Sequence, residues 1–259
     1  MTSPAVAQED SERTFDRLVD EGQQRLGRSW TGLTSTALLG GIDVGAGAIA
    51  LLIVENQTHS IVLAGLAFSI GFIALTLASS ELFTEGFLVP VAAVVAKKAN
   101  VLALLRLWGV SIGGNLVGGW VLMGIAMAAF PNLRTTALEA GKFYISLGWS
   151  MRAFCLAIIG GFVITLMTHM QHSTESDGVK LVPAVVMGFL LGAGKLNHAI
   201  VASLLTFAAL HVGAPFGYVD WAKLFVLSAL GNMVGGLGLV TLLRLLQVPH
   251  KVAAERRQK

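Results

Sequence analysis

The segment Phe68–Pro90 reads FSIGFIALTLASSELFTEGFLVP, and the rest of the chain can be understood from it. It begins as an ordinary membrane-spanning run, and a polar stretch containing Glu81, Thr84, Glu85 and Gly86 then interrupts it before apolar sequence resumes. Free N–H and C=O groups at such an interruption find no partners in lipid, so the interruption must be buried in protein or line a watery path. Broken helices of this kind carry the selective sites of many transporters and channels.

The composition is that of a helical membrane protein with several spans. Of the 259 residues, 54% are hydrophobic and 13% are charged, whereas soluble domains contain about 45–50% and about 25%. We therefore predict an all-α polytopic membrane protein surrounded by the lipid bilayer. The single cysteine, Cys155, excludes an intrachain disulfide. The formal charge of +3 is attributed to membrane topology, and no nucleic-acid partner is expected.

Six apolar segments are each long enough to cross the hydrocarbon core. The second and fifth of these segments are broken, the fifth by GAGKLNH. The expected spans are 31–54, 61–96, 101–130, 145–169, 181–212 and 219–246. The chain thus divides into an N-terminal segment (1–29), a six-span domain (30–247) and a basic tail (248–259).

The N-terminal segment predicts an amphipathic helix over residues 9–29. Phe15, Leu18, Val19 and Leu26 fall on roughly one face of it. That face suits a helix lying along the membrane surface. A solvated helix that packs on a neighbouring subunit is the alternative.

The distribution of lysine and arginine predicts the orientation, because positive residues concentrate on the cytoplasmic side. The N-terminal segment, the connections after spans two and four, and the C-terminal end together carry 13 of them, and the other connections carry three. Both termini are therefore expected in the cytoplasm, with the protein in the inner (plasma) membrane. The three on the opposite side are Arg134, Lys142 and Lys223.

Two copies of one motif indicate an internal repeat. Residues 114–119 read GNLVGG and residues 231–236 read GNMVGG, and each copy lies in the third span of its half. Three spans per half reverse the direction in which the second half enters the membrane. The sequence therefore predicts two inverted three-helix repeats, with a site near the midplane where the two broken helices meet. The glycines themselves also serve close helix packing.

Histidine is costly inside a membrane span, so His198 in the second break is the leading candidate site residue. It could supply positive charge to an anion or a proton to a weak acid; a satisfied structural histidine is the alternative. Asn197 stands beside it, and Lys195 precedes it by three residues. Lys195 would attract anions, or it would snorkel or pair with an acidic residue, namely Asp43, Glu81 or Glu85.

The first break and its helix supply further candidates. Thr84 could hydrogen-bond both His198 and a passing anion, or it could cap the following half-helix. The rings of Phe68, Phe72 and Phe83 could form constrictions, although such a stripe is more often packing. Lys142, before span four, could gather anions at an outer vestibule or mark the interface.

The chain resembles the formate–nitrite transporter family over roughly residues 25–247. The resemblance rests on ELFTEG after span two, WGVSIGGNLVGG in span three, Lys142, GAGKLNHAI in span five and GNMVGG in span six. Within the family it is most similar to the YfdC-like branch, because LFTE replaces the usual LFTGN or LFTS.

The resemblance implies a homopentamer of aquaporin-like protomers that pass small monovalent anions such as formate, nitrite or hydrosulfide. It identifies His198 as the central pore histidine, Thr84 as its partner and Lys142 as the vestibule lysine. Phe83 and Phe72 would form the cytoplasmic-side constriction and Phe68 the periplasmic-side one. Ala202 and Gly161 stand where the family usually has asparagine, and Lys195 and Glu85 are additions near the pore.

We therefore predict an anion channel in which His198 either stabilises the anion electrostatically or, in a proton-linked mechanism, protonates it. The alternatives are a pore for a neutral or cationic solute, which the acidic residues favour, and a non-conducting scaffold or sensor. No catalytic constellation, metal cluster or cofactor motif is recognisable in the sequence, so we expect neither an enzyme nor a cofactor.

Overall fold

The structure is a computed structural model that describes residues 4–257, and every regular element in that range is a helix. The all-α prediction is confirmed. Within these residues, five helical runs are long and apolar enough to cross a membrane: α2 (Trp30–Thr58), α3 (Ile61–Ala78), α5 (Val101–Ala129), α7 (Met151–His172) and the run α10 (Tyr218–Met233), η3 (Val234–Leu242) and α11 (Leu243–Gln247). The fifth predicted span is two shorter helices, α8 (Asp177–Ala193) and α9 (Ala199–His211), so the count of six spans stays a prediction.

Side-chain caps fix where four of these helices begin. Ser29, Ser60, Asn100 and Ser150 precede α2, α3, α5 and α7, and each accepts a hydrogen bond from a backbone N–H of the first turn. Such caps satisfy donors that the helix itself leaves free. The short helices η2 (Pro131–Leu133) and α6 (Arg134–Ser146) stand apart from α7, so the fourth span begins at Met151 and not at residue 145.

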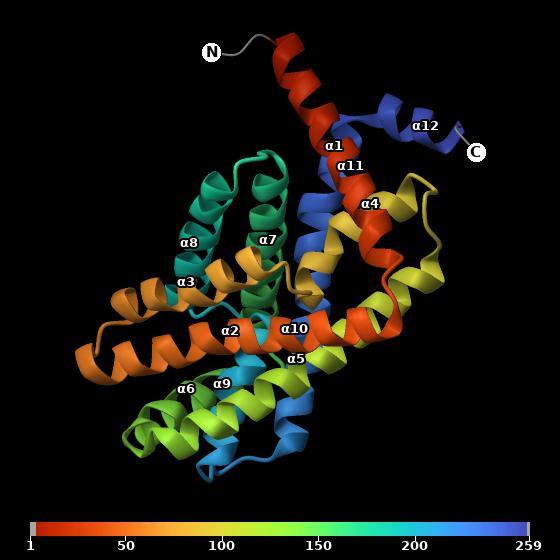
Figure 1. Cartoon of the computed structure of the whole chain (residues 1–259). Coiled ribbons are helices and arrows are strands. Elements are labelled where there is room, and N and C mark those ends of the chain that lie inside the picture. Colours follow the sequence, from red (N-terminus) through yellow and green to blue (C-terminus); the bar gives the residue numbers. More distant parts are fainter. Residues whose placement is uncertain (1–3, 258–259) are drawn as a thin grey trace.

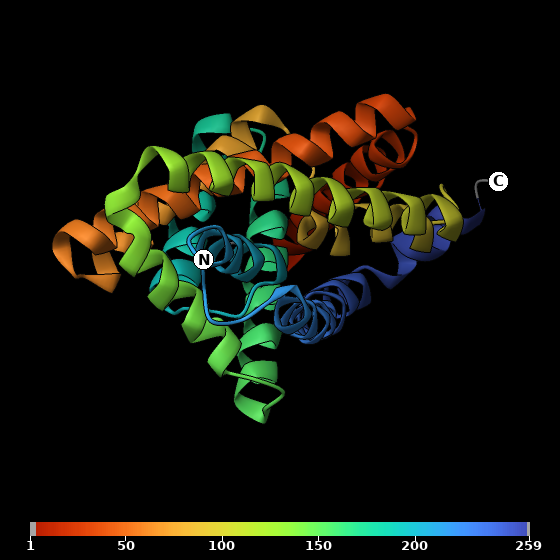
Figure 2. The same ribbon diagram turned by 90° about the horizontal axis from the view of Figure 1, so that it is seen from below.

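Both interruptions occur where the sequence predicted them. α3 ends at Ala78, and its C-cap residue Ser79 has a left-handed φ of 53°. The chain then continues into η1 (Phe83–Phe87) and α4 (Val89–Val95). In the second half, α8 and α9 are separated by residues 194–198. α2 packs against both α3 and α5, and the two broken helices meet through the contact of α3 with α8 (Figures 1 and 2).

An asparagine holds the first break in place. The side-chain oxygen of Asn115, on α5, accepts the N–H of Phe83 at 2.9 Å. Its amide nitrogen donates to the carbonyl of Glu81 at 2.8 Å and to that of Ala37, on α2, at 2.7 Å. One buried side chain thereby satisfies backbone groups that the interruption leaves free, as burial requires.

The second half repeats this arrangement. Asn232, on α10, accepts the N–H of Ala199 at 2.8 Å, and it donates to the carbonyls of Asn197 at 3.1 Å and Ala157, on α7, at 2.7 Å. Asn115 and Asn232 are the asparagines of the two GNxVGG motifs. The motif therefore marks the residue that clamps a broken helix, and the repeat extends to individual hydrogen bonds.

Each clamping asparagine lies so close to a neighbouring helix that this helix has a glycine at the point of contact. A Cβ atom on Gly161 would collide with the backbone of Asn232, and one on Gly41 would collide in the same way with Asn115. Gly161 therefore stands where no side chain fits, and an asparagine could not be accommodated there.

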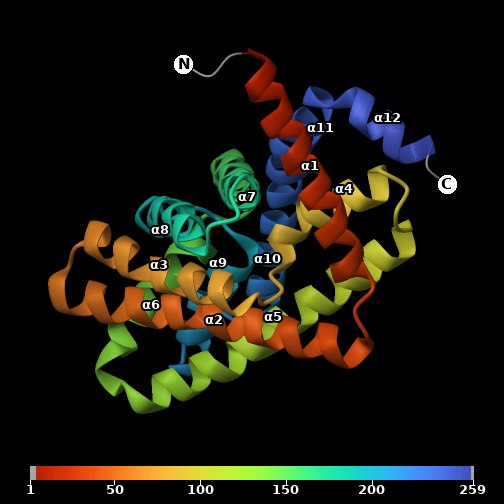
Figure 3. The same cartoon turned by 45° about the horizontal axis from the view of Figure 1, so that its top comes forward.

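The expectation for the N-terminal helix is wrong in one respect. Helix α1 (Pro4–Leu26) forms, but Phe15, Leu18 and Val19 are buried against α4 and against Val248. The apolar face of α1 therefore packs within the same chain, and not on the membrane surface or on a neighbouring subunit. The helix also meets the C-terminal α12 (Pro249–Arg257), since Asp16 pairs with Lys251 at 2.7 Å. Figures 1 and 3 show α1 lying across α4 with α12 beside it. Residues 1–3 and 258–259 of the predicted terminal segments lie outside the described residues.

Candidate functional site

Thr84 and His198 meet where the two breaks come together. The hydroxyl oxygen of Thr84 lies 2.7 Å from Nε2 of His198, and both residues are fully buried. Thr84 belongs to η1, and His198 is the N-cap residue of α9, so each half of the chain supplies one partner. The hydrogen bond that the sequence suggested between them is formed.

The cap fixes the tautomer of the imidazole. Nδ1 of His198 accepts the backbone N–H of Val201 at 3.3 Å. A backbone N–H can only donate, so Nδ1 keeps its lone pair and the proton of the neutral ring is on Nε2, which donates to Thr84. Thr84 has no other hydrogen bond within the described residues, so its own O–H remains available as a donor. A doubly protonated ring would lose the cap.

A cavity of ≈ 790 Å³ lies beside the first break, and we call it the α1 cavity. Residues of α1 line it together with the ends of α3, α7 and α8 and with Ser80 and Glu85 of the first break. Four basic and four acidic side chains line it, so the cavity is polar without a strong excess of either charge. These are Arg17, Arg25, Arg28 and Lys180, and Asp20, Glu21, Glu85 and Glu175.

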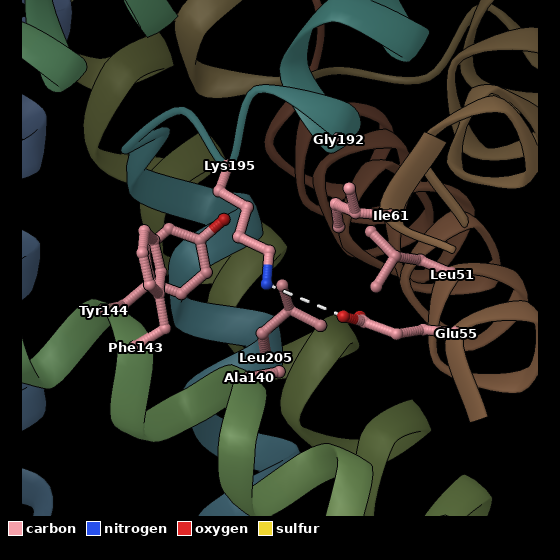
Figure 4. Close-up of a pocket in the computed structure, with 9 residues that line it drawn as sticks. All are labelled: Leu51, Glu55, Ile61, Ala140, Phe143, Tyr144, Gly192, Lys195 and Leu205. Atoms are coloured by element: carbon pink, nitrogen blue, oxygen red, sulfur yellow. Dashed lines mark ion pairs between the residues drawn. The ribbon is translucent and has the colours of Figure 1, made fainter. Parts of the chain in front are cut away.

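A second, smaller space lies next to the other break, and we call it the Lys195 pocket. Its volume is ≈ 10 Å³, about the room that one water needs. Residues of α2, α3, α6, α8 and α9 surround it, and Lys195 reaches across it toward Glu55 (Figure 4). The ammonium nitrogen lies 3.6 Å from a carboxylate oxygen of Glu55. The partner of Lys195 is therefore Glu55 and none of the three acidic residues named from the sequence.

The two cavities give the direction of the broken helices. α3 runs from Ile61, in the Lys195 pocket, to Leu75, in the α1 cavity. α8 packs against α3 and runs the opposite way, from Lys180 in the α1 cavity to Gly192 in the Lys195 pocket. Equivalent helices of the two halves are therefore antiparallel, which confirms the inverted repeat.

Two phenylalanines occupy the level between the cavities. Phe68 and Phe72 are fully buried on α3, with ring centroids 5.3 Å apart in an edge-to-face arrangement. Phe83 instead joins a cluster in which its ring lies 5.0 Å from that of Phe87 and 6.5 Å from that of Trp108. Phe68 and Phe72 therefore separate the two cavities along α3, and their role as constrictions stays a prediction.

The acidic residues of the first break are neutralised by the N-terminal helix. Glu81 is fully buried, and Arg25 binds its two carboxylate oxygens at 2.6 and 3.0 Å. Arg28 adds a third hydrogen bond at 2.9 Å. Burial by itself lowers the pKa of Arg25, but the carboxylate of Glu81 outweighs burial and holds that pKa above its usual range. Glu85, also buried, lies 3.9 Å from Arg25 and lines the α1 cavity.

Two predicted site residues are placed differently from the others. Asn197 accepts a hydrogen bond from Ser228 at 2.7 Å and donates to the carbonyl of Ala153 at 3.2 Å, so its buried side chain holds the break in position. Lys142 is exposed on α6 and lines neither the Lys195 pocket nor the α1 cavity. The structure therefore brings together His198 and Thr84, whereas Lys142 lies apart from both cavities.

Sequence reasoning missed four residues that shape the site, namely Arg25, Glu55, Asn115 and Asn232. The two asparagines carried a usable signal, because the same polar residue recurs in both copies of a motif that was interpreted through its glycines. Arg25 and Glu55 carried none, because their partners lie 56 and 140 residues away along the chain.

These features define a class: helical membrane proteins with two inverted repeats, whose broken helices meet at a buried polar pair, as in channels and transporters. The formate/nitrite transporter family model matches residues 12–246. The chain belongs to this family, as its motifs predicted.

Relatives and solved structures agree with this assignment. The inner membrane protein YfdC of Escherichia coli is 29% identical over 94% of this chain and 82% of its own length. The formate channel BtFdhC of Bacillus thuringiensis is 24% identical over 88% of this chain and 92% of its own length. A solved FNT family ion channel superposes with a TM-score of 0.80 at 16% identity, covering 91% of this chain and 99% of that one. A pentameric formate channel with formate bound gives 0.70 at 23% identity, covering 83% and 95%.

Proposed function

We propose that this protein is a channel for small monovalent anions of the formate and nitrite kind, with the Thr84–His198 pair as its central polar contact. The observation that carries the proposal is the buried pair itself, in which the Nε2–H of His198 donates to Thr84 and leaves the Thr84 O–H to donate to a passing anion. Stripping water from an anion is costly. A hydrogen bond to a charged group returns about 1.5–3 kcal/mol, so the Thr84 O–H, strengthened by the bond it accepts from His198, offsets part of that cost.

We infer that His198 is a neutral imidazole while the pair binds an anion. Giving a proton to the anion requires an imidazolium, because loss of Nε2–H from the neutral ring would leave an imidazolate. Forming the imidazolium breaks the bond from Val201 to Nδ1. Hydrogen-bond donation keeps that bond, and it needs no change in the charge of His198.

Further features of the proposal rest on the fold and on the relatives. Phe68 and Phe72 would close the path between the two cavities, and the α1 cavity would be the cytoplasmic vestibule, with both termini on that side. The inner membrane is the proposed location, and a homopentamer is the proposed assembly, since a solved relative is pentameric. A pore for cations is disfavoured because Arg25 and Arg28 neutralise Glu81.

Stopped-flow measurements on proteoliposomes would test the proposal, with formate, nitrite and urea presented across a pH series. We expect wild type to pass the two anions in preference to urea. His198→Ala should lower anion flux about tenfold or more, because each lost hydrogen bond is worth about 1–3 kcal/mol. His198→Asn is the matched control, since asparagine caps helices well and keeps an N–H donor; it should retain more flux than alanine.

The outcomes separate the alternatives. Anion flux unchanged in His198→Ala would exclude the role of the pair. Flux that rises with acidity in wild type and loses this dependence in His198→Asn would replace the neutral mechanism with a proton relay. Flux of urea alone would indicate a pore for neutral solutes, and no flux at all would favour the scaffold reading.

A further inference from the structure

Lys195 stands at a backbone position that suits lysine poorly. Its φ of 45° lies in the left-handed region, which residues other than glycine occupy sparsely. Gly194 is next to it in the chain, but it has an ordinary helical φ of –76°. The conformation closes α8 in a Schellman cap, in which the N–H of Leu196 donates to the carbonyl of Leu191 at 3.1 Å. Ser79 and Lys97 have a left-handed φ at the ends of α3 and α4 as well, so the evidence for a site at Lys195 comes from its side chain.

The side chain of Lys195 is held by two weak contacts. Its ammonium nitrogen lies 3.6 Å from an oxygen of Glu55, which is longer than a hydrogen bond, and 5.3 Å from the centre of the Phe143 ring. Lys195 and Glu55 keep 37% and 24% of their side chains exposed. Figure 4 shows the ammonium group between Glu55 and the aromatic residues of α6. A pair this loose can be exchanged for another anion.

The pocket is positioned at one end of the proposed path. Gly192 lines it and packs against Phe68, the first of the two rings that separate the cavities. Lys195 belongs to the same break as His198. An anion bound to Lys195 would therefore stand directly before the rings, on the side opposite the α1 cavity.

The small volume of the pocket determines what must move. At ≈ 10 Å³ it has no room for formate or nitrite while Glu55 holds its place. The carboxylate of Glu55 has the charge and the paired oxygens of those anions, and it already occupies the position beside the ammonium group. It is thus an internal competitor for the anion.

We propose that Lys195 and Glu55 form an anion-entry site, in which a small monovalent anion with carboxylate-like oxygens displaces Glu55 from Lys195. This inference rests on the proposed anion channel. The site would place a cation at the entrance of the path, and competition from Glu55 would weaken the capture of an anion there.

A double-mutant cycle on formate flux in proteoliposomes would test the site. Glu55→Gln removes the competing charge and should lower the half-saturating formate concentration about two- to fivefold, the range of partly exposed ion pairs. Lys195→Gln should raise it by at least as much. Glu55→Gln should have no effect in the Lys195→Gln background, because the competitor then has nothing to compete for. Lys223→Gln is the matched control, because Lys223 is an exposed lysine that is expected on the same side of the membrane and lines neither cavity; it should behave as wild type. Elution of each variant at the wild-type position in size-exclusion chromatography would establish that it folds.

The results distinguish this inference from the function on which it rests. Wild-type anion flux with an unchanged half-saturating concentration in both single variants would overturn the entry site and leave the channel standing. Equal effects of Glu55→Gln in the two backgrounds would also overturn it, because Glu55 would then act without Lys195. Absence of anion flux in wild type would overturn both.

Discussion

Replacing Arg25 by methionine should destabilise the protein strongly, because it leaves a buried carboxylate with one partner. Arg25 supplies two of the three hydrogen bonds to Glu81, which is fully buried. Removing one partner of a buried ion pair costs about 3–5 kcal/mol. Arg28 remains as a partner, so we expect about 3 kcal/mol. For a chain of this length that corresponds to a fall in Tm of about 6–12 °C.

Thermal melting of the detergent-purified protein, followed by tryptophan fluorescence, would measure the change. Arg13→Met is the matched control, since Arg13 lies on the same helix and its pair with Asp10 is solvent-exposed; such pairs contribute about 1 kcal/mol or less. Arg25→Met combined with Glu81→Met should recover part of the loss, because no buried charge is then left unpaired. If Arg25→Met melted within about 2 °C of Arg13→Met, the ion pair would not hold α1 in place.

Two further predictions concern the repeat and the response to acid. Asn115→Ala and Asn232→Ala should destabilise equally, by about 3 kcal/mol for three hydrogen bonds each, and clearly unequal melting temperatures would contradict the equivalence of the two clamps. Burial raises the pKa of Glu21, but the hydrogen bond with His172 outweighs burial and, with nearby charges, lowers that pKa to about 2. The stabilisation is present above the ordinary value of 4.5 and is lost as pH falls through about 2. The melting temperatures of wild type and Glu21→Gln should therefore differ at neutral pH and converge toward pH 2, whereas a constant difference would exclude this origin.

The helices and their breaks could be predicted because their causes are local. Apolar runs and polar interruptions determine where a helix crosses or stops, so both interruptions and the repeat were found from the sequence. The environment of each helix face could not be predicted in the same way. Phe15 and Leu18 form the same amphipathic pattern whether the face meets lipid or α4, and only the tertiary structure decides between them.

The residues of the site show the same contrast between local and long-range causes. His198 stands out because a histidine is costly within a span, and Thr84 because it lies in the opposite break. Pairs between distant residues gave no such signal. The sequence offered Lys195 three acidic candidates in other spans, yet Lys195 pairs with Glu55 of α2. The choice among partners depends on how α2 and α8 are placed in space, which no local pattern records.

The docking of α1 has a consequence for how the protein is made. α1 is synthesised before the other helices of this sequence. α4, on which it packs, is synthesised after two membrane helices, and α12, which it also contacts, after all the others. During synthesis its apolar face therefore has no protein surface to cover, and the nearest apolar phase is the lipid interface. We expect α1 to lie at the lipid interface until α4 is inserted. Its amphipathic pattern predicts the wrong place in the finished fold, but it predicts the place that we expect for α1 during translation.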